Sequence, residues 1–366
     1  MKKFLILLTS IGIILSSCGK DDPEVEDVIF DKEEVASIEQ LNRAAFKLYD
    51  EFVSGKKESY AFSPLSMEFT LGMEANSVEH SSLMGFLEQN SLESGNSLFE
   101  KIREKLNHKE NGKESSLSNA LFNNTLFPKD NNLNSAAKDY FKAEIFDEDF
   151  TDNEAVMDKI HDWLMKNSKG FLNIPKVDIS PSFPRVLCNA MYFKQEWANP
   201  FKVDDTKMGD FTGADENVRK VPMMNIRNSF NYYSSSSLTA LEMPYANDSF
   251  SMTFILSDKD ALSFEDLQAV RKGLTKSDVK VSIPRFDTET TLFFDMNSWG
   301  YDSLFGLHVA RVKTDEIGTE AAAVTELFLG ASNSSSGPVV FKADHPFFYV
   351  ITDNETGLIL FIGRYC

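Results

Sequence analysis

Hydrophobic residues follow a helical spacing in the first half of the chain and a strand-like spacing in the second half. Between Glu34 and Phe52 they recur every three or four residues, as on the buried face of a helix. Ala155–Asn167 shows the same spacing. Short apolar runs predict strands at Ala120–Phe127, Val186–Phe193, Thr239–Met243, Ser251–Leu256 and Val279–Ile283, and the prolines Pro244 and Pro284 end the third and fifth of them. Helices mostly early and strands mostly late predict an α+β fold.

The tetrapeptide Ser63-Pro-Leu-Ser66 predicts the start of another helix. The Ser63 hydroxyl can cap the first turn, and Pro64 suits the first helical position, where a backbone N–H is not needed. From Lys32 to Cys366 we find no long linker, internal repeat or change of composition. We therefore predict a single domain over residues 34–366, although the length alone would allow two.

The first seventeen residues are predicted to be an export signal. Lys2 and Lys3 precede an apolar run that is too short to span a bilayer. The run ends in Leu15-Ser-Ser-Cys18, which resembles the lipobox of bacterial lipoproteins, and an ordinary signal peptide with an incidental cysteine is the alternative. The resemblance implies that Cys18 carries a lipid and that residues 18–33 form an acidic tether. Lys20-Asp-Asp22 resembles the tag of surface-exposed Bacteroidetes lipoproteins, so we expect an outer-membrane anchor on the cell surface.

Charge and composition narrow the classes of function. The net charge of −19 argues against nucleic acid and heparin as partners. The three cysteines form no disulfide framework, so stability must come from a core, for which 42% hydrophobic residues suffice. We find no nucleophile elbow, zinc-protease motif or phosphate-binding glycine loop, and the five histidines have no metal-ligand spacing. The sequence therefore predicts neither an enzyme nor a bound metal or cofactor.

The stretch that follows Asp315 has an unusual pattern. If it forms a strand, its side chains alternate between two faces. One face has only small or apolar side chains: Thr319, Ala321, Ala323, Thr325, Leu327 and Leu329. The other face has both charged side chains and consists of Glu320, Ala322, Val324, Glu326 and Phe328. A strand that slides between two others needs small side chains first and one face without charge. The alternative is that Glu316–Leu329 is an ordinary helix or an exposed linker.

Seven short motifs, in order, make the chain from about Glu34 to Tyr365 resemble the serpin family. They are Phe62-Ser-Pro-Leu-Ser66; Asn189-Ala-Met-Tyr-Phe-Lys194 with Trp197 and Pro200-Phe201; Val221-Pro-Met-Met224; Leu241-Glu-Met-Pro-Tyr245; Ile283-Pro-Arg-Phe286; His345-Pro-Phe347; and Ile362-Gly-Arg364. The resemblance implies a serpin fold with three β-sheets, eight or nine helices and an exposed reactive loop at about 316–340. Between Phe286 and His308 the chain is shorter than is usual for the family. The resemblance therefore does not extend to the local helix of this segment or to the strand that leads into the loop.

The resemblance also assigns roles to residues. Ser63, Ser66, Asn189 and His308 would form the polar cluster where the large sheet opens. Glu316 and Arg285 would form an ion pair at the top of the opening, beside Trp197. The hinge of the loop would comprise Glu316, Gly318, Thr319, Glu320, Ala321, Ala322, Ala323, Val324 and Thr325. Thr319 is then expected to be the first side chain that must pass under the sheet.

The function implied by the resemblance is irreversible suicide inhibition of a serine protease. The protease cuts the loop, forms an acyl-enzyme and is trapped when the loop inserts into the large sheet. Counting from Glu316 places the cut at Ser332–Asn333, and counting back from His345 places it at Ser335–Ser336. A serine before the cut favours elastase-like or subtilisin-like proteases. The alternative is a non-inhibitory surface binding protein, which the small hinge residues disfavour. We expect a monomer whose partners are the protease, bound covalently, and the membrane.

Overall fold

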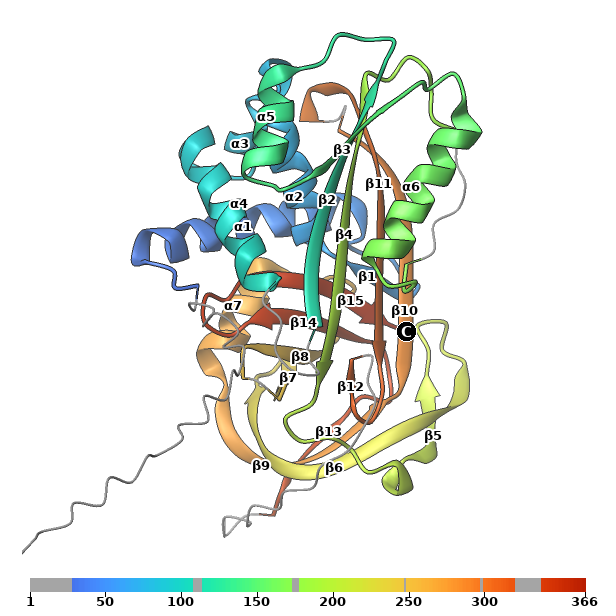
Figure 1. The fold of residues 1–366 in the computed structure, drawn as a ribbon. Coiled ribbons are helices and arrows are strands. Elements are labelled where there is room, and N and C mark those ends of the chain that lie inside the picture. The colour runs from blue at the N-terminus through green and yellow to red at the C-terminus, as the bar shows by residue number, and fades with distance from the viewer. Residues whose placement is uncertain (1–27, 108–113, 173–177, 247, 297–298, 320–336) are drawn as a thin grey trace, which may run out of the picture.

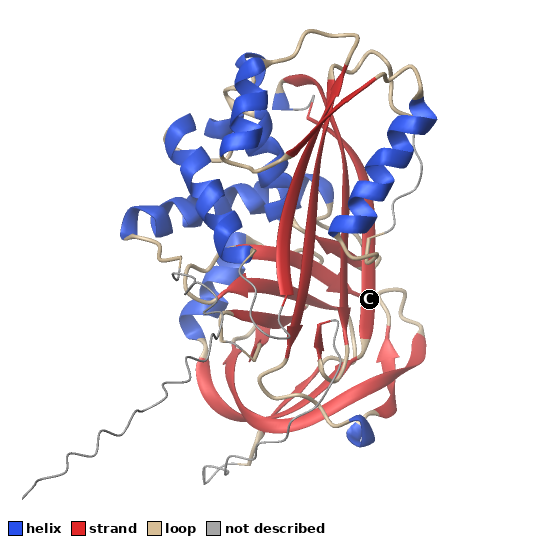
Figure 2. Ribbon diagram, viewed as in Figure 1, coloured by secondary structure: helices blue, strands red, loops and turns tan. Residues whose placement is uncertain are grey.

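The computed structural model describes residues 28–107, 114–172, 178–246, 248–296, 299–319 and 337–366. Two β-sheets form the body of the protein, and helices pack against the faces of these sheets (Figures 1 and 2). The fold is α+β, as the sequence predicted. The predicted signal peptide with Cys18, the hinge residues 320–325 and both candidate reactive bonds lie outside the described residues.

The six-stranded sheet has the strand order β10-β11-β12-β4-β2-β3. These strands are β2 (Glu114–Asn124), β3 (Glu144–Glu148), β4 (Arg185–Glu196), β10 (Phe286–Met296), β11 (Tyr301–Thr314) and β12 (Gly318–Thr319). β4 is antiparallel to β2 from Arg185 to Lys194, and β10 forms a hairpin with β11. Of the connection between these two strands, residues 299–300 are described, and Trp299 has 3₁₀ geometry. The strand β11, which leads into the loop, runs over 14 residues.

The other nine strands form one hydrogen-bonded network. Its order is β1-β15-β14-β8-β7-β6-β9-β13, and β5 pairs with β6. The strands are β1 (Tyr60–Phe62), β5 (Lys207–Thr212), β6 (Val218–Ser234), β7 (Leu238–Pro244), β8 (Phe250–Ser257), β9 (Thr275–Pro284), β13 (Val339–Lys342), β14 (Phe347–Asp353) and β15 (Ile359–Tyr365). The long strand β6 pairs with β5 at its start and with β7 at its end. Two of the three expected sheets are therefore continuous through β6.

Seven α-helices and two 3₁₀ helices occur among the described residues. They are α1 (Lys32–Phe52), α2 (Pro64–Glu74), α3 (Leu83–Phe86), α4 (Leu92–Leu106), α5 (Asn131–Asp139), α6 (Asn153–Asn167), α7 (Phe264–Gly273), η1 (Val78–His80) and η2 (Val203–Asp205). α2 begins as predicted, because the Ser63 hydroxyl accepts a hydrogen bond from the Ser66 amide and Pro64 is the first helical residue. α1 begins two residues before the predicted start, where Asp31 forms a capping box with Glu34.

The predicted bounds of one strand were wrong. β2 runs from Glu114 to Asn124, not from Ala120 to Phe127. Its first half is polar in sequence, but the buried Ser115 and Asn119 donate hydrogen bonds to the carbonyls of Leu106 (2.6 Å) and Phe141 (2.9 Å). Polar side chains that are satisfied in this way can be buried at little cost, so an apolar run does not mark this strand.

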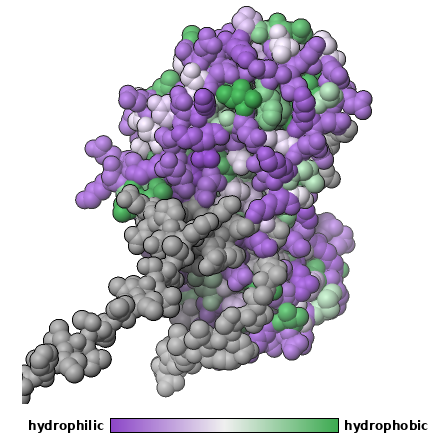
Figure 3. Space-filling model, in the orientation of Figure 1, coloured by the Kyte–Doolittle hydropathy of each residue, from purple (hydrophilic) through white to green (hydrophobic). Residues whose placement is uncertain are grey.

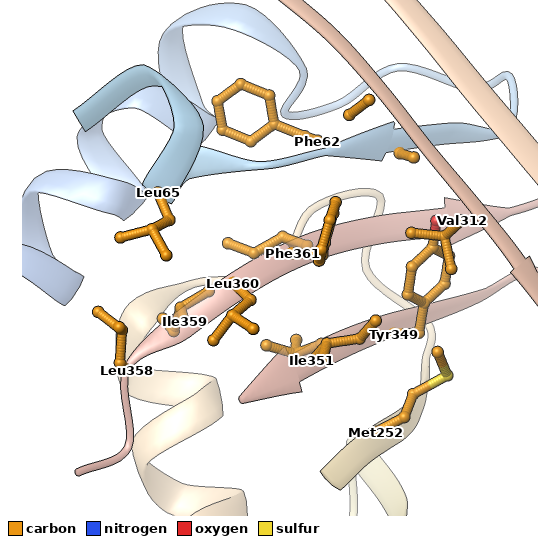
Figure 4. Close-up of a cluster of buried hydrophobic side chains, with 14 of the residues drawn as sticks. Phe62, Leu65, Met252, Val312, Tyr349, Ile351, Leu358, Ile359, Leu360 and Phe361 are labelled. Atoms are coloured by element: carbon orange, nitrogen blue, oxygen red, sulfur yellow. The ribbon is translucent and has the colours of Figure 1, made fainter. Parts of the chain in front are cut away.

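Two hydrophobic cores lie on opposite faces of the six-stranded sheet. Met191 and Phe193 of β4 belong to the larger core, between the two sheets and the helices α1, α2 and α4. Cys188 and Ala190, the alternate residues of the same strand, pack against α6. Part of the larger core, where α2 meets β14 and β15, is shown in Figure 4. Burial on both faces explains why residues 186–193 of β4 are apolar except for Asn189.

The outer surface is mostly hydrophilic on the face shown in Figure 3. This agrees with a net charge of −19. None of the helices among the described residues is long and apolar enough to cross a membrane.

Candidate functional site

An open slot between β4 and β11 is the main feature of the six-stranded sheet. The two strands are separated by β12, which is only two residues long and lies at one end (Figure 1). Gly318 pairs with Glu196, and Thr319 pairs with both Gln195 and Thr314. Beyond this point, no described strand pairs with the inner edge of β4 or of β11. Their backbone N–H and C=O groups can therefore accept one more strand.

A cavity of about 300 Å³ extends along this slot and through the sheet. On one side it is lined by Met157, Ile160 and Leu164 of α6. Further along, its walls include Asn189 of β4 and Val309 of β11. The opening in the sheet therefore lies beneath α6. A new strand that entered the slot would have to pass this helix.

β12 is held tightly at its end of the slot, which is the lower end in Figure 1. A side chain at Gly318 would collide with the backbone of Gln195 and Glu196, so glycine is required there. Thr319 is buried, and its hydroxyl forms a hydrogen bond of 2.8 Å with the hydroxyl of Tyr245. The expectation that Thr319 is the first side chain to pass under the sheet is therefore wrong, since it is already seated in the intact protein.

The ion pair expected at the top of the opening is present. Arg285 and Thr206 both donate to Oε1 of Glu316, the latter over 2.7 Å. Burial would raise the pKa of the Glu316 carboxyl, but these two hydrogen bonds outweigh it and lower the pKa. Trp197 stacks on Tyr245 with ring centroids 4.7 Å apart, and its indole N–H donates to the Asp315 carbonyl over 3.0 Å. The base of the loop is therefore fixed from both sides.

Three of the four residues expected in the sheet-opening cluster lie together. The Ser63 hydroxyl donates to the Leu360 carbonyl (2.9 Å) and accepts from the Ser66 amide. The Ser63 amide donates to Nε2 of His308 (3.3 Å), so this nitrogen carries no proton. Burial lowers the pKa of His308 to about 3, and the ring is neutral at pH 7. Together these contacts tie β11 to the start of α2 and to β15.

The fourth residue, Asn189, makes a separate contact. Its Nδ2 donates to Oδ1 of Asn119 on β2 over 2.8 Å, while its own Oδ1 is buried and has no hydrogen-bond partner in the described part of the chain. An unsatisfied buried acceptor is costly and rare. Asn119 was missed from the sequence, where an asparagine between serine and alanine resembles a loop residue.

A buried charged group at the far end of the slot was also missed. Glu74 at the end of α2 accepts hydrogen bonds from Nε of Arg185 (3.0 Å), the first residue of β4, and lies 2.6 Å from Nδ1 of His80. The hydrogen bond with Glu74 raises the pKa of His80. Because Arg185 is 111 residues from Glu74 in the sequence, no spacing rule could have joined this pair. All three residues line the cavity described above.

The chain that follows α6 crosses the slot. The Phe171 carbonyl accepts a hydrogen bond from Arg311 of β11 (3.2 Å), and the Phe171 ring lies 4.8 Å from the Arg311 guanidinium. The same ring contacts Tyr192 of β4 edge-on, at a centroid distance of 6.1 Å. Phe171 therefore contacts both strands that border the slot. We call residues 168–172 the strap, because a strand entering from β12 would meet them.

Comparison with known families identifies the fold's relatives. The family described as serpin (serine protease inhibitor) matches residues 39–308 and 306–366. This chain belongs to the serpin family. It is similar to human neuroserpin, with 29% identity over 85% of this chain and 86% of that protein. It is also similar to an uncharacterized serpin-like protein of Thermococcus kodakarensis, with 28% identity over 92% of this chain and 87% of that protein.

Solved structures confirm the fold of this serpin. The native state of the thermophilic serpin tengpin is similar with a TM-score of 0.78 and 24% identity, covering 93% of this chain and 96% of that chain. Human thyroxine-binding globulin in complex with its hormone is similar with a TM-score of 0.77 and 22% identity, covering 91% and 97%. Members of this family are typically protease inhibitors rather than enzymes. Among the described residues of this serpin, no group of three metal-binding side chains occurs.

Proposed function

We propose that this serpin is an irreversible suicide inhibitor of serine proteases and that its cut loop inserts between β4 and β11. The observation that carries the proposal is the slot itself, bordered by two unpaired strand edges and begun at one end by β12. A strand already paired over two residues gives an inserting segment its register and direction. A protein that only binds a partner on its surface would need neither an open slot nor a strand that begins to fill it.

The pairing of β12 defines which residues would face one another after insertion. Antiparallel pairing moves one residue back along β4 and β11 for each residue forward along the loop. Ala321 would then lie opposite Phe193 and Val312, and residue 329 would lie opposite Arg185, at the end of β4. Residues 320–329 would fill the slot. Thr319 points into the core, so the small residues 321, 323 and 325 would do the same.

The same register gives Asn189 the partner that it lacks. Thr325 would lie between Asn189 of β4 and His308 of β11, with its side chain on their face of the sheet. A threonine hydroxyl can donate to the unpaired Oδ1 of Asn189. Insertion would thereby join Asn189 to the sheet-opening cluster, from which it is separate in the intact protein.

Insertion supplies the free energy that traps a protease. A strand of about ten residues makes at least about ten new backbone hydrogen bonds, each worth about 0.5–1.5 kcal/mol net, so the gain is of order ten kcal/mol. The intact protein must then be kinetically trapped. The protease serine attacks the carbonyl before the cut, the downstream segment leaves as a free amine, and an ester joins the two proteins. Fast insertion would distort the bound protease before water hydrolyses this ester.

The finer parts of the proposal rest on the sequence. We propose cleavage at Ser332–Asn333 or Ser335–Ser336 by an elastase-like or subtilisin-like protease, since the residue before either bond is a serine. We also propose an outer-membrane lipid anchor on Cys18 that exposes the protein at the cell surface. A non-inhibitory binding protein is the second candidate, because thyroxine-binding globulin in complex with thyroxine has this fold. The small residues of the hinge favour inhibition.

The test is to mix the protein with serine proteases of different specificity and to look for SDS-stable complexes. Mass spectrometry of the released fragment identifies the bond that is cut. Ala321→Arg would place a charge in the core during insertion, so this variant should be cut normally but release active protease. Glu320→Arg, on the opposite face, is the matched control and should still trap. If Ala321→Arg traps as fully as the wild type, insertion into this slot is refuted.

A further inference from the structure

The buried charged residues Glu74, Arg185 and His80, which we call the Glu74 cluster, connect the two strands that border the slot. Besides its hydrogen bonds to the Glu74 carboxylate, Arg185 donates to the Ser77 hydroxyl over 3.1 Å. The His80 ring contacts the ring of Tyr301 edge-on, at a centroid distance of 6.3 Å. Arg185 is the first residue of β4, and Tyr301 is the first residue of β11. The cluster therefore joins the beginnings of both strands.

The slot between these strands is narrower than a full strand requires. Because β12 is antiparallel to both β4 and β11, these two strands are parallel to each other, and both begin at the end opposite β12. Some Cα atoms of β4 lie within 8 Å of Cα atoms of β11. Two strands that flank a third are about 9.5 Å apart. Insertion along the whole slot therefore requires β4 and β11 to move apart.

Separating the two strands would strain the Glu74 cluster, which is almost entirely buried. The side chain of Glu74 is 1% exposed, that of Arg185 is 12% exposed and that of His80 is 14% exposed. Breaking a buried ion pair leaves a charge without a partner in a dry site, and this costs far more than breaking an exposed pair. The cluster therefore resists widening of the slot at the end opposite β12.

We propose that the Glu74 cluster is a latch that holds β4 and β11 together and sets the rate at which the slot widens. Arg185 and Glu74 form its connection to β4, and the contact of His80 with Tyr301 forms its connection to β11. The proposal rests on the proposed function, because widening of the slot must precede insertion of the cut loop. The latch residues are positioning residues, since they act by holding the two strands.

Protonation of His80 makes the latch stronger. The charged groups near its ring are Glu74 at the end of α2, Glu79 of η1 and Arg185 of β4, and the phenol of Tyr301 faces it from β11. The hydrogen bond with Glu74 raises the pKa of His80, although burial opposes this effect. The stabilisation of the closed slot is therefore complete below the ordinary histidine pKa of about 6.5, and it is lost as the pH rises through the raised pKa.

The test measures how fast the slot accepts a strand when no protease is present. The probe is a fluorescent synthetic peptide with the sequence of residues 320–329, and its uptake is followed by fluorescence anisotropy at pH 6.5 and pH 8.5. His308, whose pKa is about 3, stays neutral over this range. The wild type should take up the peptide faster at pH 8.5. His80→Gln can still donate to Glu74 but carries no charge, so it should be about fivefold faster than the wild type at pH 6.5 and nearly independent of pH. His161→Gln, at a partly exposed histidine of α6 that is not among the described residues lining the cavity, should behave like the wild type.

Two substitutions of Tyr301 test the connection to β11. Tyr301→Leu removes the ring contact with His80 and should accelerate uptake about fivefold at pH 6.5, whereas Tyr301→Phe keeps the ring and should match the wild type. If either His80→Gln or Tyr301→Leu takes up the peptide at the wild-type rate at pH 6.5, or if no protein takes it up, the latch is overturned. SDS-stable complexes with proteases are measured separately. If they are absent while both variants show faster uptake, the proposed function fails and the latch stands.

Discussion

Because His308 is buried in its neutral form, the folded protein should lose stability in mildly acidic solution. The ring is buried, accepts a hydrogen bond from the Ser63 amide, and has its pKa lowered to about 3, compared with about 6.5 for an exposed histidine. Between these two values the unfolded chain binds a proton that the folded protein does not. Stability therefore rises with pH through this window, is complete above about pH 6.5, and is lost as the pH falls.

The size of the effect follows from the width of the pH interval. One pH unit inside the window corresponds to about 1.4 kcal/mol for one group, so lowering the pH from 6.5 to 5 should cost about 2 kcal/mol through His308. The contact with Ser63 ties β11 to α2. Opening the sheet breaks this contact and allows the exposed ring to bind a proton at pH 5, so the protein should convert to an inactive form faster at pH 5 than at pH 7.5.

Urea denaturation followed by tryptophan fluorescence at pH 7.5 and pH 5 measures this effect. His308→Gln is the control, since its side-chain oxygen can still accept from the Ser63 amide but does not titrate. Other acidic groups titrate in both proteins, so the difference between the two pH dependences isolates His308. The wild type should lose about 2 kcal/mol more than the variant. Equal losses would show that His308 is not a buried neutral histidine and would refute the reasoning.

Three further predictions follow from the site. Arg285→Ala should lower the free energy of unfolding by about 1–2 kcal/mol in urea titrations, because it leaves the buried Glu316 with a weaker partner, while Arg227→Ala, which breaks an exposed pair, should change it little. Phe171→Ala should loosen the strap and increase the rate of trapping, measured by stopped-flow, and an unchanged rate would mean that the strap does not limit insertion. Cys18→Ala should move the protein from the membrane fraction to the soluble fraction, and identical fractionation would contradict the lipid anchor.

The fold class and several local features could be predicted from the sequence because they depend on neighbouring residues. Helical and alternating spacing reveal which faces are buried, and the cap at Ser63 needs only the next few residues. The resemblance to the family, based on motifs that occur in the family's order, also predicted the Arg285–Glu316 pair and the contact of Ser63 with His308. The predicted start of β2 failed, since its buried serine and asparagine are satisfied by groups distant in sequence.

Only the tertiary structure decided how the site is arranged. It shows that Thr319 is already seated against Tyr245, that the slot beyond it is open, and that Asn189 has an acceptor without a partner. It also brings Glu74 of α2 to Arg185 of β4, at the far end of that slot. Strand pairing and buried hydrogen bonds join segments far apart in the sequence, 74 residues for Tyr245 and Thr319 and 111 for Glu74 and Arg185, and the energy of such contacts depends on register and burial. The spacing of residues along the sequence indicates neither the register nor the burial of these contacts.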